Sequence, residues 1–353
     1  MKAERDPKTG RWLIQYRYTD WQGKRRKSTK RGFSTKREAE DWLRKFLTTS
    51  QMDLSMKFTD FLDLYYKDME NRLREYTIRT KKYIIDQKII PFFGEKAMNE
   101  ITAPDIRKWQ NILMQQGYSE TYLRTINNQL AAIFNYAVKY YDLKNNPCSK
   151  AGSIGKSKAE KVEFWTKQEF MAFIGSMDKE SEAYVVFMLL YWTGMRVGEA
   201  LALSADDIDF SRGIISISKS YQRIKRRDVI TPPKTPKGKR KIRIPGFLAE
   251  CLKQYITKQQ EEKNKIRVFK ITKYLLLKEM QKGIAESGVK TIRIHDLRHS
   301  HASLLVEMGF TPLEIAERLG HERIETTLNT YSHLYPDKQD RLADRLEEEY
   351  YKK

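Results

Sequence analysis

The sequence predicts a mainly α-helical protein with small β-sheets, divided into three domains. Apolar residues recur at helical spacing through residues 57–141 and again from residue 163 onward. Residues 12–18 and 214–218 instead alternate, which is the period of a half-buried strand. A chain of 353 residues also exceeds the usual size of one domain. We therefore expect a small sheet with one helix, a helical domain, and a mixed, mostly helical third domain.

Residues 1–50 form the first predicted domain. The alternating stretch 12–18 is followed by a turn at residues 21–23 and a second strand, and a capping box from Thr35 to Glu38 begins a helix. The domain holds 15 Lys and Arg against 6 Asp and Glu, a net charge of +9. A basic strand pair has the width and charge to enter a DNA major groove, although a solvated basic face is the alternative. The candidate DNA-binding residues are Lys24, Arg25, Arg26, Lys27, Lys30 and Arg31.

Residues 57–141 form the second predicted domain, which is helical throughout. Helix starts are indicated at Thr77, Thr102 and Ser119. Residues 142–162 lack periodicity and are rich in Asn, Pro, Gly, Ser and Lys, so their composition predicts a linker.

Residues 163–353 form the third predicted domain. A capping box from Thr166 to Glu169 begins its first helix. Strands over 214–218 and 241–244 indicate a small β-sheet inserted among helices. The chain ends in a tail where Leu342 and Leu346 form an apolar pair one helical turn apart. This pair could pack on its own domain or on a neighbouring copy.

Composition restricts the partner of this protein. The formal net charge is +21 and the pI is about 9.6, which favours nucleic acid over a membrane surface because clustered cations bind phosphates. No apolar run approaches the length of a spanning helix, and two cysteines are too few for a disulfide framework or a zinc site. We expect an intracellular protein that acts in the cytoplasm, at the bacterial nucleoid.

The histidines gather at one end of the chain. All five fall within the last sixty residues, a distribution that packing alone hardly explains: His295, His299, His301, His321 and His333. His295 and Arg298 are three residues apart and share one face of a helix. Such a pair suits a phosphate, although a chance surface arrangement is equally compatible with this spacing.

Four motifs, in this order, resemble the catalytic motifs of tyrosine recombinases of the lambda-like integrase family. They are Thr193–Glu199, His295–His299, Leu319–His321 and Thr330–His333. The basic region between residues 12 and 33 resembles the arm-site-binding domain of integrases from phages and conjugative transposons. The helical middle resembles their core-site-binding domain, and residues 163–353 their catalytic domain. The resemblance therefore covers nearly the whole chain.

The resemblance implies a site-specific DNA recombinase that integrates or excises a mobile genetic element. Its tyrosine displaces a deoxyribose 5′-oxygen and leaves a 3′-phosphotyrosyl bond, which conserves the phosphodiester energy. Tyr331 is the implied nucleophile, because it lies ten residues after His321. Two guanidinium groups, those of Arg196 and Arg298, can neutralise the charge that spreads over the phosphate oxygens. No cofactor is implied, and no metal, because no carboxylate cluster accompanies the motifs.

The remaining roles follow from the same resemblance. His295 handles a proton and His321 donates to the scissile phosphate, while Glu199 supports the site. Lys234, in Pro233–Thr235, is assigned as general acid for the leaving oxygen, with Lys237, Lys239 and Lys241 as close rivals. His299 and His301 are interpreted as structural residues, and His333 has no assigned role.

Double-stranded DNA is the expected partner, at core and arm attachment sites. A homo-tetramer should assemble on it, assisted by accessory DNA-bending or excision proteins. Two other functions compete. A type IB topoisomerase shares the chemistry, but the arm-like domain argues against it. A non-catalytic DNA-binding regulator would not need a full set of active-site residue types.

Overall fold

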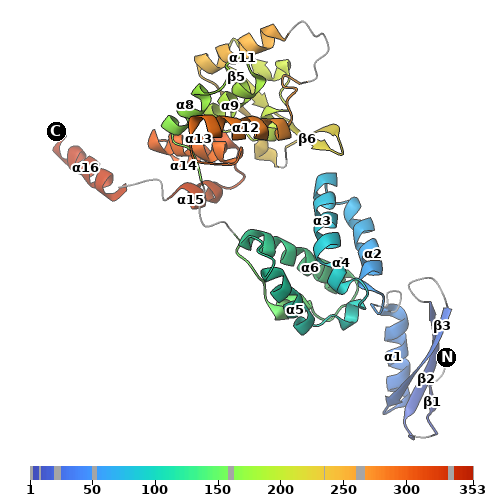
Figure 1. Cartoon of the computed structure of the whole chain (residues 1–353). Helices are drawn as coiled ribbons and strands as arrows, with labels where there is room; N and C mark the ends of the chain where they lie inside the picture. Colours follow the sequence, from blue (N-terminus) through green and yellow to red (C-terminus); the bar gives the residue numbers. More distant parts are fainter. Residues whose placement is uncertain are drawn as a thin grey trace. The chain divides into compact units, whose positions relative to one another are not determined.

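The computed structural model (Figure 1) describes residues 3–7, 9–19, 25–49, 54–157, 163–233, 235–259, 267–332 and 338–352. The chain divides into two compact units, Met1–Glu160 and Lys161–Lys353. The predicted fold class is confirmed, since helices predominate and the sheets are small and antiparallel. Within the described ranges, no helix is both long and apolar enough to cross a membrane.

The first unit begins with a three-stranded antiparallel sheet and one helix. Its elements are β1 (Ala3–Arg5), β2 (Trp12–Thr19), β3 (Arg25–Phe33) and α1 (Lys36–Thr49), in the strand order β1-β2-β3. Ile14 and Tyr16 face α1 and are buried with Phe33, Ala39 and Leu43. A bulge at Gly32, where φ is +96°, turns Phe33 onto this face.

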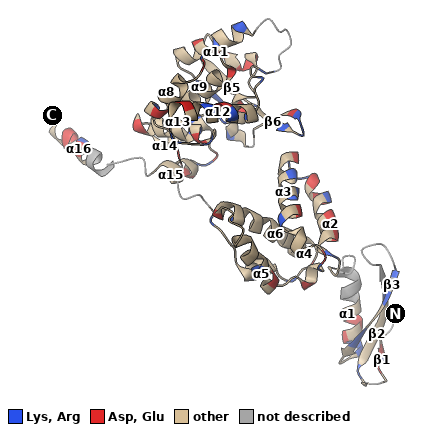
Figure 2. Ribbon diagram, in the orientation of Figure 1, with Lys and Arg blue, Asp and Glu red and all other residues tan. Residues whose placement is uncertain are grey.

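The strand register sorts the basic residues of β3 between the two faces of the sheet. Arg17 pairs with Lys27, and Arg25 lies two residues before Lys27, so all three point away from α1 and are exposed. Arg31 lies on the same face and bonds the buried Asp6 carboxylate at 3.0 Å. Lys30 points to the other face, with its Nζ 5.9 Å from the Trp42 ring. Lys24 lies outside the described residues, as does the side chain of Arg26. Figure 2 shows the basic colouring along β3.

A helical body follows in the same unit. Its helices are α2 (Phe58–Glu70), α3 (Glu75–Lys88), α4 (Ile90–Phe93), η1 (Met98–Glu100), α5 (Ala103–Met114), α6 (Glu120–Tyr140) and α7 (Pro147–Ala151). The structure differs from the sequence expectation at residues 147–154, which the composition placed in a linker. Cys148 and Ala151 are buried in the helical core, and Gln110 donates to the Gly152 carbonyl at 2.8 Å. Composition misses this because a single short helix has no readable period.

The second unit is helical with two small sheets. Its helices are α8 (Lys167–Gly175), α9 (Glu182–Thr193), α10 (Val197–Ala200), η2 (Ala205–Asp207), η3 (Pro236–Gly238), α11 (Gly246–Lys258), α12 (Lys273–Ser287), α13 (Asp296–Glu307), α14 (Pro312–Leu319), α15 (Ile324–Tyr331) and α16 (Lys338–Tyr351). Its strands are β4 (Ile208–Asp209), β5 (Ile214–Ile217), β6 (Ser220–Ile224), β7 (Arg227–Thr231) and β8 (Arg240–Arg243). Strands β4, β5 and β8 form one sheet, and β6 and β7 a hairpin, so the predicted inserted sheet is present.

Among its described residues, the second unit has two apolar clusters, and the candidate nucleophile belongs to the smaller one. Apolar side chains of α8, α9, α11 and α12 and of strands β5 and β8 form the main cluster. A smaller cluster joins α13, α14 and α15, and Tyr331 is one of its members. Packing of these three short helices therefore determines where the candidate nucleophile lies.

Candidate active site

The turn after α9 begins the site. Gly194 ends α9 with φ at +66°, and a Cβ there would lie 2.6 Å from side-chain atoms of both His301 and Leu319. Glycine is therefore required for backbone conformation and for close packing. The chain then reverses, and Arg196 caps the next helix, α10, with its side chain 41% exposed.

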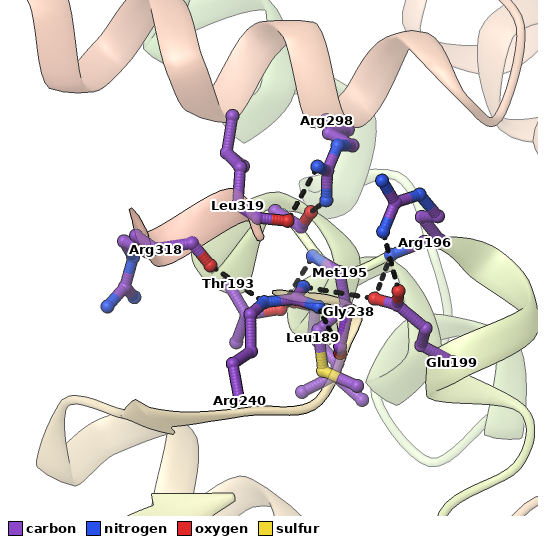
Figure 3. A network of polar contacts seen from close by, with 11 residues as sticks. Leu189, Thr193, Met195, Arg196, Glu199, Gly238, Arg240, Arg298, Arg318 and Leu319 are labelled. Carbon is purple, nitrogen blue, oxygen red and sulfur yellow. Dashed lines mark hydrogen bonds and ion pairs between the residues drawn. The ribbon is translucent and has the colours of Figure 1, made fainter. Parts of the chain in front are cut away.

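Glu199 lies in the same short helix and is buried. It accepts from Arg196 Nη1 at 2.8 Å and from the Arg196 backbone N–H at 3.0 Å. Arg240 Nη2 donates to Oε2 at 3.0 Å, the same oxygen that accepts from the Arg196 backbone. Burial alone would raise the pKa of Glu199, but Arg240 and Arg196 outweigh it and lower the pKa below 4.5. Glu199 is thus a buried carboxylate that holds two guanidinium groups (Figure 3).

Arg240 connects separate segments of the site, and the sequence analysis did not single it out. Besides Glu199, it donates from Nε to the Arg318 carbonyl at 2.9 Å and from Nη1 to the Gly238 carbonyl at 3.3 Å. The α10 turn, the loop before β8 and the end of α14 are therefore tied to one side chain. In the sequence Lys-Gly-Lys-Arg-Lys, nothing distinguishes this arginine from its basic neighbours.

Arg298 is buried on α13. Its Nη1 donates to the Gly194 carbonyl at 2.7 Å. Its Nη2 donates to the Leu319 carbonyl at 2.6 Å (Figure 3). These two bonds fix the plane of the guanidinium group. Burial, with Arg196 nearby, lowers the pKa of Arg298 to about 9, which leaves the group protonated at neutral pH.

His321 follows α14 and lies beside these arginines. Its Nδ1 is 2.7 Å from the hydroxyl of Thr327, a buried residue of α15. Burial, followed by Arg298 and Arg196, lowers the pKa of His321 to about 3, so the free protein holds a neutral ring. The preceding residue, Gly320, allows the chain here to pass close to the backbone of Lys237, because a Cβ at position 320 would lie 2.7 Å from the Lys237 carbonyl oxygen.

His295 and His299 lie one helical turn apart at the start of α13. Their ring centroids are 5.6 Å apart and the rings are nearly perpendicular. Desolvation by packed protein atoms, with His299 and Arg298 nearby, lowers the pKa of His295 well below 6.5. Desolvation also lowers the pKa of His299.

Tyr331 ends α15 and is 2% exposed. Its hydroxyl lies 2.6 Å from Nδ1 of His299, and burial raises its pKa. From the sequence, His299 is interpreted as a structural residue. The structure instead places it in contact with the candidate nucleophile. No periodicity could reveal this contact, because the two residues are 32 positions apart.

His301 matches its structural interpretation. It is buried, and its Nε2 accepts from Arg318 Nε at 3.0 Å. Lys234 and His333 lie outside the described residues. Three other tyrosines near the end of the chain compete with Tyr331 as the nucleophile: Tyr335 also lies outside the described residues, and Tyr350 and Tyr351 are exposed on α16.

Together these side chains form a site with excess positive charge. Arg196, Arg240 and Arg298 surround one carboxylate, that of Glu199, while the nearby histidines are neutral. Like charges held together in a partly buried site favour an anion. The arrangement can bind a phosphate beside a tyrosine hydroxyl.

Comparison with known proteins agrees with this geometry. Residues 163–338 match the Phage integrase family, residues 57–114 its N-terminal SAM-like domain, and residues 4–50 an Arm DNA-binding domain. The ICEBs1 integrase of Bacillus subtilis (strain 168) is 31% identical over 308 residues, covering 83% of each chain.

Two solved structures share the fold. The Tn1549 transposon integrase, in complex with transposon right-end DNA, has a TM-score of 0.65 at 22% identity and covers 80% of this chain and 99% of its own. A lambda integrase tetramer bound to a Holliday junction has a TM-score of 0.59 at 16% identity and covers 92% of this chain and 91% of its own. By sequence and fold, the protein belongs to the phage integrase family of tyrosine recombinases and is a site-specific DNA recombinase.

Proposed function

We propose that Arg196 and Arg298 hold the DNA phosphate that Tyr331 attacks. The observation that carries this proposal is the cluster of three guanidinium groups beside the tyrosine, two of which are bonded to the buried carboxylate of Glu199. A transferring phosphoryl group gains negative charge on its equatorial oxygens, and fixed guanidinium donors stabilise it without reorganisation.

The reaction is a reversible exchange of phosphodiesters. The Tyr331 oxygen forms a bond to phosphorus, the bond to the deoxyribose 5′-oxygen breaks, and a 3′-phosphotyrosyl intermediate results. Attack by a 5′-hydroxyl of another strand reverses the step and joins the DNA. His321 donates a hydrogen bond to a phosphate oxygen, and Lys234 protonates the leaving 5′-oxygen. His295, to which the resemblance assigns a proton-handling role near the nucleophile, lies beside His299 in this site, and Glu199 positions Arg196.

Double-stranded DNA is the partner that this site requires, and recombination joins two duplexes. We infer a tetramer at the synapse, supported by the lambda integrase tetramer on a Holliday junction. The exposed basic face of the β2–β3 sheet, with Arg17, Arg25 and Lys27, is proposed to bind arm sites. Accessory DNA-bending or excision proteins would act on this assembly.

The tail helix α16 is proposed to join neighbouring protomers. The side chain of Leu342, one member of the predicted apolar pair, lies outside the described residues. Helix α16 exposes Leu346 and Tyr350, which are also one turn apart, among several acidic residues. A mainly apolar cavity of about 630 Å³ is lined by residues in and beside β8, α11, α13 and α14, among them Phe247, Met308 and Phe310. Its charged lining residues are Lys241, Arg243 and Arg318, with Glu314 and Glu317. The apolar stripe of the helix complements the apolar lining, and its acidic residues can pair with the three basic lining residues, which outnumber the two glutamates.

A denaturing gel of covalent adducts tests the central proposal. Tyr331→Phe should bind a nicked core-site duplex but form no covalent complex, whereas Tyr350→Phe, at an exposed tyrosine of α16, should retain adduct formation. An adduct that persists in Tyr331→Phe would move the nucleophile to another tyrosine. Relaxation of plasmids without a cognate site would instead indicate a topoisomerase.

A further inference from the structure

The hydroxyl of Tyr331 meets one histidine directly. Oη lies 2.6 Å from Nδ1 of His299, and the two ring centroids are 5.7 Å apart. Helix α13 supplies the histidine and α15 the tyrosine, and the apolar cluster of Ala302, Val306, Ile315, Leu319 and Tyr331 packs these helices together. The contact is therefore built into the packed domain.

The charge states make His299 an acceptor in this contact. Burial lowers the pKa of His299, so its ring is neutral near pH 7, and burial raises the pKa of Tyr331, so the phenol keeps its proton. A neutral imidazole with its proton on Nε2 has a free lone pair on Nδ1. The phenol O–H of Tyr331 then donates to Nδ1 of His299. The imidazole is therefore in position to accept the proton that Tyr331 must lose when it attacks.

We propose that His299 is a catalytic residue that takes the proton of Tyr331 during strand cleavage and returns it during joining. This inference rests on the proposed function of Tyr331 as nucleophile. As Oη bonds to phosphorus, the O–H bond breaks and its proton moves to Nδ1, while the 5′-oxygen leaves and is protonated elsewhere. In joining, the departing tyrosine oxygen recovers the proton from the imidazolium.

The geometry favours His299 over His295 for this step. The His295 ring lies one turn earlier, with its centroid 5.6 Å from that of His299, and the short contact to Oη is made by His299. The neighbouring Arg298 is anchored to two carbonyl oxygens, which holds this turn of α13 in place. His299 therefore occupies a fixed position at the nucleophile.

Charged and titratable groups face His299 from both sides. Arg293, His295, Asp296 and Arg298 surround it from the start of α13, while Tyr331 and His321 approach from α15 and the preceding turn. Protonation of His299 at low pH would remove the acceptor, so cleavage should slow as pH falls through the pKa of His299. Because that pKa is lowered in the free protein, the acid limb of kcat/KM, which reports groups of the free enzyme, should lie below pH 6.5.

The first experiment uses His299→Asn in the full-length protein. Asparagine offers a polar atom near the position of Nδ1 but cannot accept a proton. Single-turnover cleavage of a nicked core-site duplex should slow by about 10² to 10⁴-fold, while DNA affinity and thermal stability stay within error. The acid limb of the parent pH–rate profile should disappear in the variant, although His295 and His321 remain.

A second measurement separates a base from a structural contact. Fluorinated tyrosine at position 331 lowers the pKa of the nucleophile, so the contribution of a base should shrink. The rate ratio between parent and His299→Asn should therefore fall when the tyrosine is fluorinated. In the parent protein, the acid limb of the pH–rate profile should stay at the same pH when Tyr331 is fluorinated, because the limb reports the protonation of His299.

The outcomes are distinct. An unchanged rate in His299→Asn, a rate ratio insensitive to fluorination, or an acid limb that follows the phenol pKa would each overturn the role of His299. If His299→Asn fails to fold, the fluorination series in the parent protein decides alone. Absence of covalent adducts in the parent would instead refute the proposed function of Tyr331.

Discussion

Arg240 and Glu199 form a buried ion pair at the centre of the site, with Nη2 3.0 Å from Oε2 and side chains only 7% and 3% exposed. The pair spans 41 positions of sequence. Glu199 also bonds Arg196, which is a candidate phosphate-binding residue. The position of Arg196 therefore depends on Arg240, which reaches the same carboxylate from another side (Figure 3).

Arg240→Met should displace Arg196 and slow cleavage by about 10²-fold, since small misplacements of a positioned group have effects of that size. Arg240→Lys should recover only part of the rate, because an ammonium cannot reproduce the three directed bonds. Arg243→Met, on the same strand with an exposed side chain, is the control. Single-turnover cleavage with DNA affinity measured separately checks this, and equal rates in both methionine variants would contradict it.

The same pair should make stability depend on pH. The pKa of Glu199 is lowered from 4.5, so its ion pairs stabilise the fold above about pH 4.5, and this contribution is lost as pH falls through the folded-state pKa. Without Arg240, the buried carboxylate loses its main partner and its pKa should rise. Thermal unfolding from pH 4 to 7 should show Arg240→Met destabilised by about 3–5 kcal/mol near neutrality. The difference in free energy of unfolding between the parent and Arg240→Met should become smaller as the pH falls. A difference that is independent of pH would refute this explanation.

Thr327 should act as a positioning residue for His321. If the Thr327 hydroxyl donates to Nδ1, the ring proton lies on Nε2, which can then donate to phosphate. Thr327→Val should slow cleavage about 10-fold or more, given the effect of removing one oxyanion donor, and Thr327→Ser should restore it. NMR of ring nitrogens reports the tautomer directly. The adjacent, exposed Thr326→Val is the matched control, and equal behaviour of the two valine variants would exclude this role.

Lys234 should act as the general acid for the leaving 5′-oxygen. An alkoxide leaves poorly near neutral pH, so Lys234→Ala should slow cleavage of ordinary DNA by about 10² to 10⁴-fold. A substrate with sulfur at the bridging 5′ position releases a thiolate that needs no proton, so the variant should cleave it nearly as fast as the parent. Equal slowing on both substrates would make Lys234 a phosphate-binding residue and move the acid to Lys237, Lys239 or a histidine.

The basic face of the N-terminal sheet should bind arm sites independently of cleavage. Deletion of residues 1–50 should abolish protection of arm repeats in footprinting while core-site cleavage survives. Replacing Arg17, Arg25 and Lys27 by Gln should reproduce the loss and reduce the salt dependence of arm binding. Arg11→Gln with Lys36→Gln and Arg37→Gln, at three exposed positions outside β2 and β3, removes the same number of positive charges and is the control. Loss of core cleavage on deletion would show that the domain belongs to the active assembly.

The tail helix should be needed for synapsis but not for DNA binding. Leu346→Asp removes the apolar stripe of α16, and Phe310→Asp disrupts the proposed acceptor cavity. Each should lower tetramer formation and recombination while single-site cleavage persists, because cleavage by one protomer needs no neighbour in this proposal. Mixing the two variants tests docking between protomers. The intact tail helix of a Phe310→Asp protomer can dock on the intact cavity of a Leu346→Asp protomer, so recombination should be partly restored. Full recombination by protein truncated after Pro336 would refute the docking.

Much of the architecture could be predicted because it is encoded locally. The capping boxes at Thr102 and Thr166 appear where the sequence indicates helix starts, since an N-cap side chain bonds backbone only three residues away. Alternation predicted the strand at Ile214–Ile217 for a similar reason. The stretch 147–154 was the exception, because its burial depends on Gln110 and Arg107 of a distant helix.

The sequence by itself determined the family, the excess of positive charge and the motif residues, since these depend on residue types at short spacings. Tertiary structure decided which of those residues meet. His299 contacts Tyr331 only because α13 and α15 share a buried cluster, and Arg240 reaches Glu199 only because β8 lies beside α10 and α14. Lys30 likewise lies on the helix face only through the register of two strands. Contacts across many positions arise from packing and burial of the whole domain, and no local pattern encodes them.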